Sequence, residues 1–145
     1  MSSNQKTYQL SHRGNLFWVK ARVGGKGVKP LVVPLLVDTG SSYTIMPLHV
    51  LQRVGCDTEN PLRREEIITG QGKIYAPVVR IAWLNCVGQL VENFPVVGHT
   101  IPGGLRVSGL LGMDFLTHCR AVISVGDAEI RFTGNKFRGE WRESY

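Results

Sequence analysis

The sequence has no long apolar run. No apolar stretch approaches the roughly 20 residues that a membrane-spanning helix needs. The first ten residues, MSSNQKTYQL, also lack the charged-then-apolar pattern of a secretory signal. We therefore expect a protein without a membrane span, located in the cytoplasm.

Cysteine and histidine are scarce as well. The three cysteines, Cys56, Cys86 and Cys119, are widely spaced and form no C-x-x-C pair, so neither a disulfide framework nor a zinc site is expected from them. The four histidines show no H-x-x-x-H or H-E-x-x-H spacing. The sequence therefore predicts buried reduced thiols, no metal site and no cofactor.

Charge is moderately one-sided, with a net charge of +6. A basic balance can indicate a nucleic-acid partner. No run of Lys and Arg exceeds two residues, however, and basic residues are not interleaved with aromatic ones in a recognisable RNA-binding pattern. We expect a solvated basic surface rather than a nucleic-acid site, and a nucleic-acid-associated accessory role rests on charge alone.

What is present is a chain of 145 residues, 43% apolar, with 17 Gly and 7 Pro. That length suits one domain, and short β-branched and aromatic runs separated by Gly and Pro are typical of an all-β protein. Strands are expected near residues 7–12, 15–23 and 31–37, hairpins over 65–83 and 121–132, a strand or strand pair over 86–98, a strand within 107–112, and short helices after Pro47 and from Met113.

The hexapeptide VDTGSS, residues 37–42, follows the apolar run LVVPLLV and occurs once. A strand would deliver the Asp38 carboxylate, and Thr-Gly-Ser would then turn the backbone sharply. Gly40 would let the backbone approach the carboxylate, and the amides of Gly40 and Ser41 could donate to carboxylate oxygens. The Thr39 hydroxyl could bond to the Thr39 of a second copy across a two-fold axis. The Ser41 side chain could support the outer oxygen of the Asp38 carboxylate. Because Asp and Gly both favour turns, the tripeptide alone is also compatible with an ordinary turn.

Peptide hydrolysis without a metal requires a base for water and an acid for the carbonyl oxygen, and two neighbouring carboxyls can supply both. Two unit charges about 4 Å apart repel by roughly 4 kcal/mol at an effective dielectric of 20, so such a pair shares a proton. One aspartate cannot play both roles. A single motif therefore points to two chains that share one site.

A second motif, GLLGMDFL at residues 109–116, lies downstream, with a Gly-tipped hairpin between the two. Together they resemble the retropepsin-like aspartic proteases, over about Leu16 to Phe132. The resemblance implies an all-β, closed β-barrel domain of the pepsin and retropepsin type, with one or two short helices and one lobe per chain. It also implies a homodimer that binds a peptide or protein substrate.

Carried over by position, the resemblance makes Asp38 the catalytic residue, with Thr39, Gly40 and Ser41 as support. A mobile hairpin that closes over substrate, the flap, would include Ile67, Gly70, Gln71, Gly72, Ile74 and Tyr75. Leu110, Leu111 and Gly112 would form the strand beside the catalytic loop. The implied division is a flexible tail (1–6), the protease domain (7–134) and a basic C-terminal tail (135–145), whose Trp141 is a candidate contact at a dimer interface.

The chain departs from the retroviral pattern. Met113 stands where retroviral enzymes usually carry Arg, the catalytic turn reads DTGSS, and residues 85–108 and the tail KFRGEWRESY are additional. The mode of dimerisation is therefore open. Asp114 and Asp127 are not expected to be a second catalytic acid, because neither follows an apolar strand with Thr-Gly or Ser-Gly after it.

The sequence thus predicts an aspartic endopeptidase that activates water between the two Asp38 carboxylates of a homodimer. The alternative is a catalytically weak or inactive module that keeps the retropepsin fold and binds a peptide or a partner, since fold alone does not establish activity.

Overall fold

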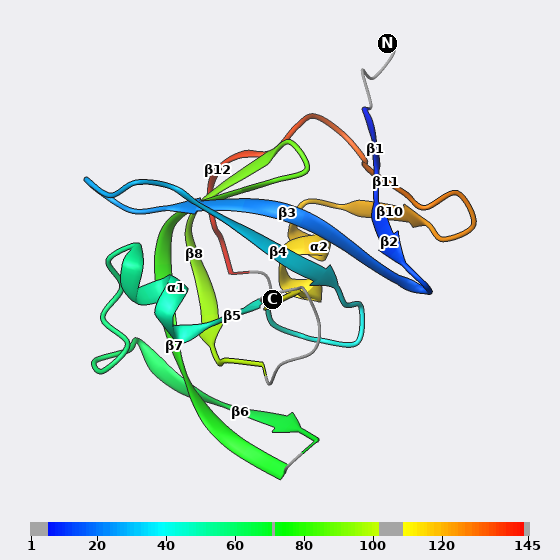
Figure 1. Ribbon diagram of the computed structural model, residues 1–145. Coiled ribbons are helices and arrows are strands. Elements are labelled where there is room, and N and C mark those ends of the chain that lie inside the picture. The colour runs from blue at the N-terminus through cyan, green and yellow to red at the C-terminus, as the bar shows by residue number, and fades with distance from the viewer. Residues whose placement is uncertain (1–5, 71, 102–108, 144–145) are drawn as a thin grey trace.

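The computed structural model describes residues 6–70, 72–101 and 109–143 and consists mainly of β-strands (Figure 1). The strands are β1 (Thr7–Gln9), β2 (Ser11–Arg13), β3 (Leu16–Gly24), β4 (Leu31–Val37), β5 (Ile45–Met46), β6 (Arg63–Thr69), β7 (Gly72–Cys86), β8 (Gln89–Gly98), β9 (Gly109–Leu111), β10 (Ala121–Ser124), β11 (Glu129–Phe132) and β12 (Arg138–Glu140). The helices are α1 (Leu48–Arg53) and α2 (Met113–His118). Within the described ranges, no helix has the length and apolar character needed to cross a membrane.

Six strands close into a barrel. Hydrogen-bonded neighbours follow the order β8-β5-β9-β4-β3-β7, and β7 pairs again with β8. The β3–β4 and β7–β8 pairs are antiparallel, whereas β4–β9 and β5–β8 are parallel. The predicted all-β fold with a closed barrel and short helices is therefore confirmed.

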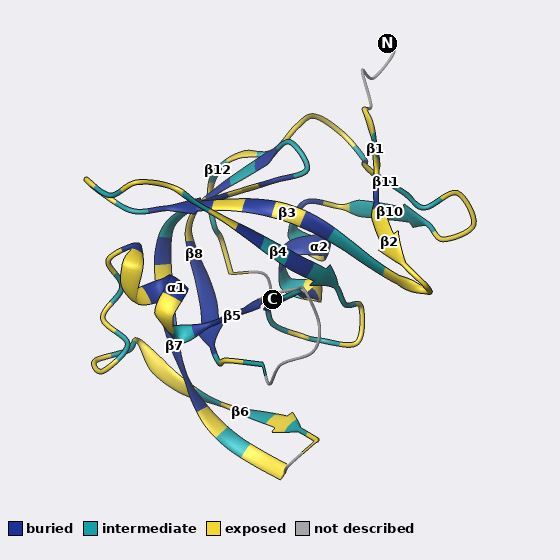
Figure 2. Ribbon diagram, in the orientation of Figure 1, coloured by how far each residue is buried: buried dark blue, intermediate teal, exposed yellow. Residues whose placement is uncertain are grey.

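Alternation along the strands sends one set of side chains into the barrel. In β3, Val19, Ala21 and Val23 are buried and the residues between them are exposed (Figure 2). The rings of Phe94 and Phe115 meet edge to face in the core, with centroids 6.2 Å apart. Burial of each large apolar side chain contributes about 1.5–3 kcal/mol, so this interior holds the strands that carry the site.

A small second sheet has the order β1-β11-β10. The single strand expected over residues 7–12 is wrong in this respect: β1 pairs with β11, while β2 pairs with β3 of the barrel. Leu10, between them, is buried, and its amide donates to the Ala128 carbonyl. The chain changes sheets at this residue, and strand propensity alone does not distinguish two sheets.

The hairpin of β6 and β7 projects from the barrel (Figure 1). Its register pairs Thr69 with Gly72, and β6 ends its pairing at Arg63–Val78. Beyond that point, β7 continues into the barrel beside β3 and β8. The predicted hairpin is confirmed, although Gln71 lies outside the described residues.

The other expected elements also form. The strand over 31–37 has the predicted bounds, and Pro34 lies where only β3 pairs with it, because pairing with β9 begins at Leu35.

Pro47 precedes α1, and Gly55 follows it with φ +94°. The strand expected within 107–112 is β9, although residues 107 and 108 lie outside the described residues. Residues 1–5 of the predicted flexible tail also lie outside them.

The C-terminal segment packs on its own chain. Strand β12 pairs in parallel with β8, and the Trp141 ring lies 4.9 Å from Phe94 and 4.5 Å from His118, measured between centroids. The Phe137 amide donates to Gln89 Oε1 at 2.7 Å. Intrachain packing therefore accounts for Trp141, and a role of the tail in dimerisation stays a prediction.

The thiols are reduced. Cys86 and Cys119 are buried and Cys56 is partly buried. Burial raises the pKa of Cys86 and of Cys119 to about 12, and the nearby Cys119 adds to the shift at Cys86. These two thiols are therefore protonated, unreactive members of the core.

Candidate active site

Asp38 lies directly beyond the end of β4, beside β9. The parallel pairing of these strands extends one step further, since the Asp38 amide donates to the Leu111 carbonyl at 3.0 Å. The side chain is partly exposed, and its Oδ1 accepts a hydrogen bond from the Gly40 amide at 2.9 Å. A barrel strand and a tight turn together fix this carboxylate.

The loop that follows is braced by its own backbone. The Ser41 amide donates to the Asp38 carbonyl at 3.2 Å, and the Ser41 hydroxyl donates to the Tyr43 carbonyl at 2.6 Å. The hydroxyl therefore holds the turn and does not support the outer oxygen of Asp38, the role expected for it from the sequence.

The segment around Gly112 holds the same loop in place through backbone contacts. The Met113 amide donates to the Ser41 carbonyl at 2.8 Å. A Cβ at Gly112 would overlap the Tyr43 carbonyl and lie 2.9 Å from that of Ser41. Gly112 is needed because two backbones meet at this position.

Thr44 connects the loop to α2. Its amide donates to Asp114 Oδ2 at 2.9 Å, and its hydroxyl donates to Asp114 Oδ1 at 2.8 Å. The hydroxyl oxygen also accepts a bond from the Gly112 amide at 3.1 Å. Asp114 Oδ1 accepts a further bond from the Phe115 amide at 2.7 Å. Burial raises the pKa of Asp114, and the bonds from Thr44 and Phe115 oppose that shift. Asp114 is thus part of the scaffold of the loop.

A cavity of about 560 Å³ lies between the Asp38 loop and the projecting hairpin. Its lining residues come from the loop, from β5, β6 and β9, and from the segments that follow β6 and β8: Asp38, Gly40, Ser41, Ser42, Tyr43, Ile45, Glu66, Ile67, Ile68, Thr69, Gly70, His99, Ile101 and Leu110. A carboxylate faces a largely apolar space that has a hairpin along one side. An extended chain could lie between them.

The structure brings together only some of the flap residues expected from the sequence. Ile67 and Gly70 line the cavity. Ile74 instead packs with Ile67 against a small apolar cluster, and Tyr75 is 69% exposed. Gly72 starts β7 with φ +112°. Eight other lining residues were not predicted from the sequence: Ser42, Tyr43, Ile45, Glu66, Ile68, Thr69, His99 and Ile101. Strand alternation could have indicated only Thr69, which is two residues from Ile67 on the same strand.

Thr39 lies on a different surface. With Met113, Leu116 and Ile123 it lines a groove of about 330 Å³ along α2 and β10. Leu111 and Gly112 are buried behind the loop, while Leu110 contributes to the cavity. The residues of the two motifs therefore form three parts: cavity wall, hidden brace and outer groove.

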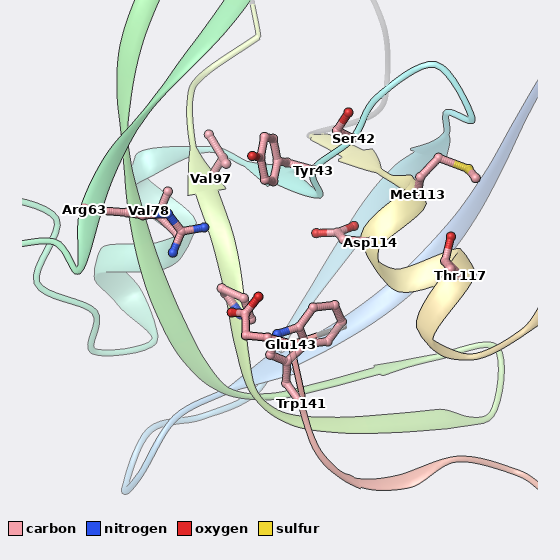
Figure 3. A pocket seen from close by; sticks show the side chains of 11 residues that line it. Ser42, Tyr43, Arg63, Val78, Val97, Met113, Asp114, Thr117, Trp141 and Glu143 are labelled. Carbon is pink, nitrogen blue, oxygen red and sulfur yellow. The ribbon is translucent and has the colours of Figure 1, made fainter. Parts of the chain in front are cut away.

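A further cavity of about 280 Å³ adjoins the first through Ser42 and Tyr43, which line both. Figure 3 shows Asp114 projecting toward it from α2 and Trp141 from the C-terminal segment. Burial raises the pKa of Tyr43, and the Glu65 carboxylate beside it adds to that effect. Glu65 also pairs with Arg63 at 3.0 Å.

Metal-binding groups are not gathered around Asp38. In residues 6–70, 72–101 and 109–143, no three His, Cys, Asp or Glu side chains lie close enough together to hold a metal ion. The polar groups along the cavity wall include the Asp38 carboxylate, the side chains of Glu66 and His99, and the hydroxyl-bearing residues Ser41, Ser42, Tyr43 and Thr69.

The barrel, the Asp-Thr-Gly turn and the Gly112 brace define a chain of the aspartic protease class. The family model described as "gag-polyprotein putative aspartyl protease" matches residues 19–118. The chain therefore belongs to this retropepsin-like aspartic protease family.

One similar solved structure is the crystal structure of a retropepsin-like aspartic protease from Rickettsia conorii. The TM-score is 0.63 at 20% sequence identity, and the match covers 90% of this chain and 96% of that chain. At this identity the likeness shows a shared fold. No curated protein sequence matches the chain.

Proposed function

We propose that the protein is an aspartic endopeptidase that hydrolyses peptide bonds as a symmetric homodimer, with Asp38 from each copy in one site. The observation that carries the proposal is a single Asp38 carboxylate, oriented by the Gly40 amide, at the wall of a 560 Å³ cavity beside a hairpin. Asp-Thr-Gly, its brace and the family membership all support a hydrolytic role for this carboxylate.

The chemistry needs both copies. The ionised Asp38 accepts a proton from water, and the resulting hydroxide attacks the scissile carbonyl carbon. The protonated Asp38 of the other copy donates its proton to the carbonyl oxygen, which gives a neutral tetrahedral diol. The first Asp38, now protonated, donates its proton to the amide nitrogen while the ionised Asp38 of the other copy accepts a proton from a diol hydroxyl. The C–N bond then breaks, a carboxylic acid and an amine are released, and the pair again holds one proton. Aspartic proteases are a well-known example of two carboxyls that share one proton.

The groove that contains Thr39 supports a dimer on that side of the catalytic loop. Its neighbours include the apolar side chains of Met113, Leu116 and Ile123. Strand β10 pairs with β11 on one edge, and the described residues provide no strand for its other edge. A second copy docking here would cover apolar surface and an open strand edge, and its own Asp38 loop would approach the first.

The substrate in this proposal is an extended peptide with apolar side chains. Ile45, Ile67, Ile68, Ile101 and Leu110 supply apolar wall to the cavity. The hairpin can donate and accept backbone hydrogen bonds by strand addition, and its closure would exclude water. Ile67, Gly70, Gly72, Ile74 and Tyr75, together with Gln71, remain the proposed flap positions.

The decisive comparison is between Asp38→Asn and Asp127→Asn. Both remove one negative charge, but Asp127 lies in the β10–β11 turn, where it accepts a bond from the Ser124 hydroxyl. We expect Asp38→Asn to lower kcat/KM for a peptide library by at least about 10²–10⁴-fold, while Asp127→Asn retains activity. Cleavage by wild type should be blocked by a statine-type inhibitor.

Sedimentation with and without that inhibitor tests assembly. Wild type should form dimers, more fully when inhibitor is bound. Full activity of Asp38→Asn, or of a monomer at any dilution, contradicts the proposal. Peptide binding without inhibitor-sensitive cleavage would identify the binding module instead.

A further inference from the structure

The basic excess of the chain is confined to its beginning. No Asp or Glu precedes Asp38, whereas six basic residues do: Lys6, Arg13, Lys20, Arg22, Lys26 and Lys29. From Asp38 onward, eleven Lys and Arg residues balance eleven Asp and Glu residues, so the first 37 residues carry the whole net charge of +6. These residues form β1 to β4, which suggests a local positive surface.

Strand alternation gathers part of this charge on one face. Lys20 and Arg22 are exposed, and the residues between and beside them, Val19, Ala21 and Val23, are buried. Two residues along a strand span about 6.6 Å. Arg13, Lys26 and Lys29, at the two ends of β3, are exposed as well.

Aromatic rings flank the two cations on the same face. Trp18 precedes Lys20 by two residues and is partly exposed. At the other end, Gly24 follows Arg22 by two residues, and a Cβ there would overlap the Trp83 ring, so the indole of Trp83 lies over Gly24. The order along the face is therefore Trp18, Lys20, Arg22 and then Trp83.

The cations of this face are not neutralised within the part of the chain that the structure describes. The ion pairs Arg63–Glu65 and Lys73–Glu66 lie on the projecting hairpin and include neither Lys20 nor Arg22. The neighbours of Lys20 and Arg22 on β4 are Pro34 and Val32, and Val32 is 59% exposed. Glu92, which pairs with Trp83 on β8, marks the acidic limit of the surface.

We propose that the outer face of β3, with Trp18, Lys20, Arg22 and Trp83, binds single-stranded nucleic acid. Lys20 and Arg22 would contact successive phosphates, and the two indoles would stack on bases. A lipid surface or an acidic peptide would satisfy the cations but gives no role to the aromatic rings that flank them on the same face. A search of the sequence for runs of Lys and Arg does not find such a site. Alternate residues of a β-strand share one face, so basic residues on that face are not consecutive in the sequence.

This site is separate from the proposed catalytic one. None of the four residues lines the Asp38 cavity or the Thr39 groove. The variant Asp38→Asn should therefore bind nucleic acid as wild type does, and a failure of the protease proposal would leave this one untouched.

The test uses fluorescence anisotropy of a labelled 20-nucleotide oligo(dT) at 50–200 mM NaCl. We compare wild type with Lys20→Glu/Arg22→Glu and with Lys136→Glu/Arg142→Glu, which changes net charge equally but lies in the exposed C-terminal segment. We expect the first double variant to bind at least about tenfold more weakly, with a salt slope smaller by about 1.4 for two lost phosphate contacts. The second should stay within about twofold of wild type.

Trp18→Leu tests stacking. We expect about tenfold weaker binding with an unchanged salt slope, and a melting curve of each variant checks its fold. Heparin and phosphatidylserine vesicles serve as anionic probes without bases. The proposal is overturned if oligo(dT) does not bind at 50 mM NaCl, if both charge variants lose affinity equally, or if heparin or vesicles bind as well as oligo(dT) and Trp18→Leu binds normally.

Discussion

Thr44 and Asp114 lie 70 positions apart in the sequence and are joined by two hydrogen bonds, one from the Thr44 amide and one from its hydroxyl. Thr44 is completely buried. Because Asp114 belongs to α2 and Thr44 follows the Asp38 turn, this pair ties the loop that carries the carboxylate to a helix of the scaffold. Preorganised loops of this kind keep a reacting group in place without cost during turnover.

Thr44→Val should destabilise the protein by about 1–3 kcal/mol. The change keeps the shape of the side chain, removes one donor from Asp114 and leaves the buried Gly112 amide without its acceptor. Urea unfolding at a fixed protein concentration measures the loss. The control is Thr58→Val. The Thr58 hydroxyl accepts an exposed hydrogen bond from Gln52, so its removal should change the free energy of unfolding by less than about 0.5 kcal/mol. Equal effects of the two substitutions would refute the role of Thr44.

Gly112→Ala should displace the loop that carries Asp38. The new methyl group would overlap the Tyr43 carbonyl, and backbone cannot move aside as a flexible side chain can. We expect a loss of about 1–3 kcal/mol in stability and a fall in peptide cleavage larger than unfolding explains. Gly126→Ala is the matched control, because a Cβ there meets nothing within 4 Å. Normal kcat/KM in folded Gly112→Ala protein would show that the brace does not position Asp38.

Gly72→Ala should impair the projecting hairpin. Gly72 has φ +112°, a conformation that L residues rarely adopt. Gly134 also has a positive φ, +85°, and a Cβ there meets open space outside the hairpin, so Gly134→Ala is the control. Strain of about 1–2 kcal/mol is expected at Gly72. We expect kcat/KM to fall for Gly72→Ala while Gly134→Ala remains near wild type. A larger fall in kcat/KM for the control variant than for Gly72→Ala would argue against a role for the backbone conformation at Gly72.

Stability should decline below neutral pH through His118. Burial lowers the pKa of this imidazole, which lies against the rings of Phe137 and Trp141. The folded state therefore prefers neutral His118, and its contribution is complete above about pH 6.5 and is lost as the pH falls through the folded-state pKa. The raised pKa of Asp114 acts in the opposite direction, so variants must be compared with wild type at each pH.

His118→Phe should accordingly flatten the dependence of Tm on pH between 7 and 5. His49→Gln, on the exposed side of α1, should keep the wild-type profile. A His118→Phe profile parallel to that of wild type would remove His118 as the cause.

Much of the fold could be predicted from residues that are neighbours in the sequence. The continuous apolar run LVVPLLV predicted the bounds of β4, and Pro47 and Gly55 predicted those of α1, because such runs and helix ends depend on neighbouring residues. The Asp38 carboxylate and its Gly-containing turn could be recognised from two local motifs taken together, VDTGSS at residues 37–42 and GLLGMDFL at residues 109–116.

The sequence by itself determined most strand-forming segments, the Asp-Thr-Gly motif and its single copy, because each depends on residues that are neighbours in the chain. Only the tertiary structure decided that Thr44 holds Asp114, that β12 adds to β8 and that Trp83 covers Gly24 beside Arg22. These contacts depend on strand register and on the closing of the barrel, which bring distant segments together. No periodicity along the chain encodes which strand becomes the neighbour of which.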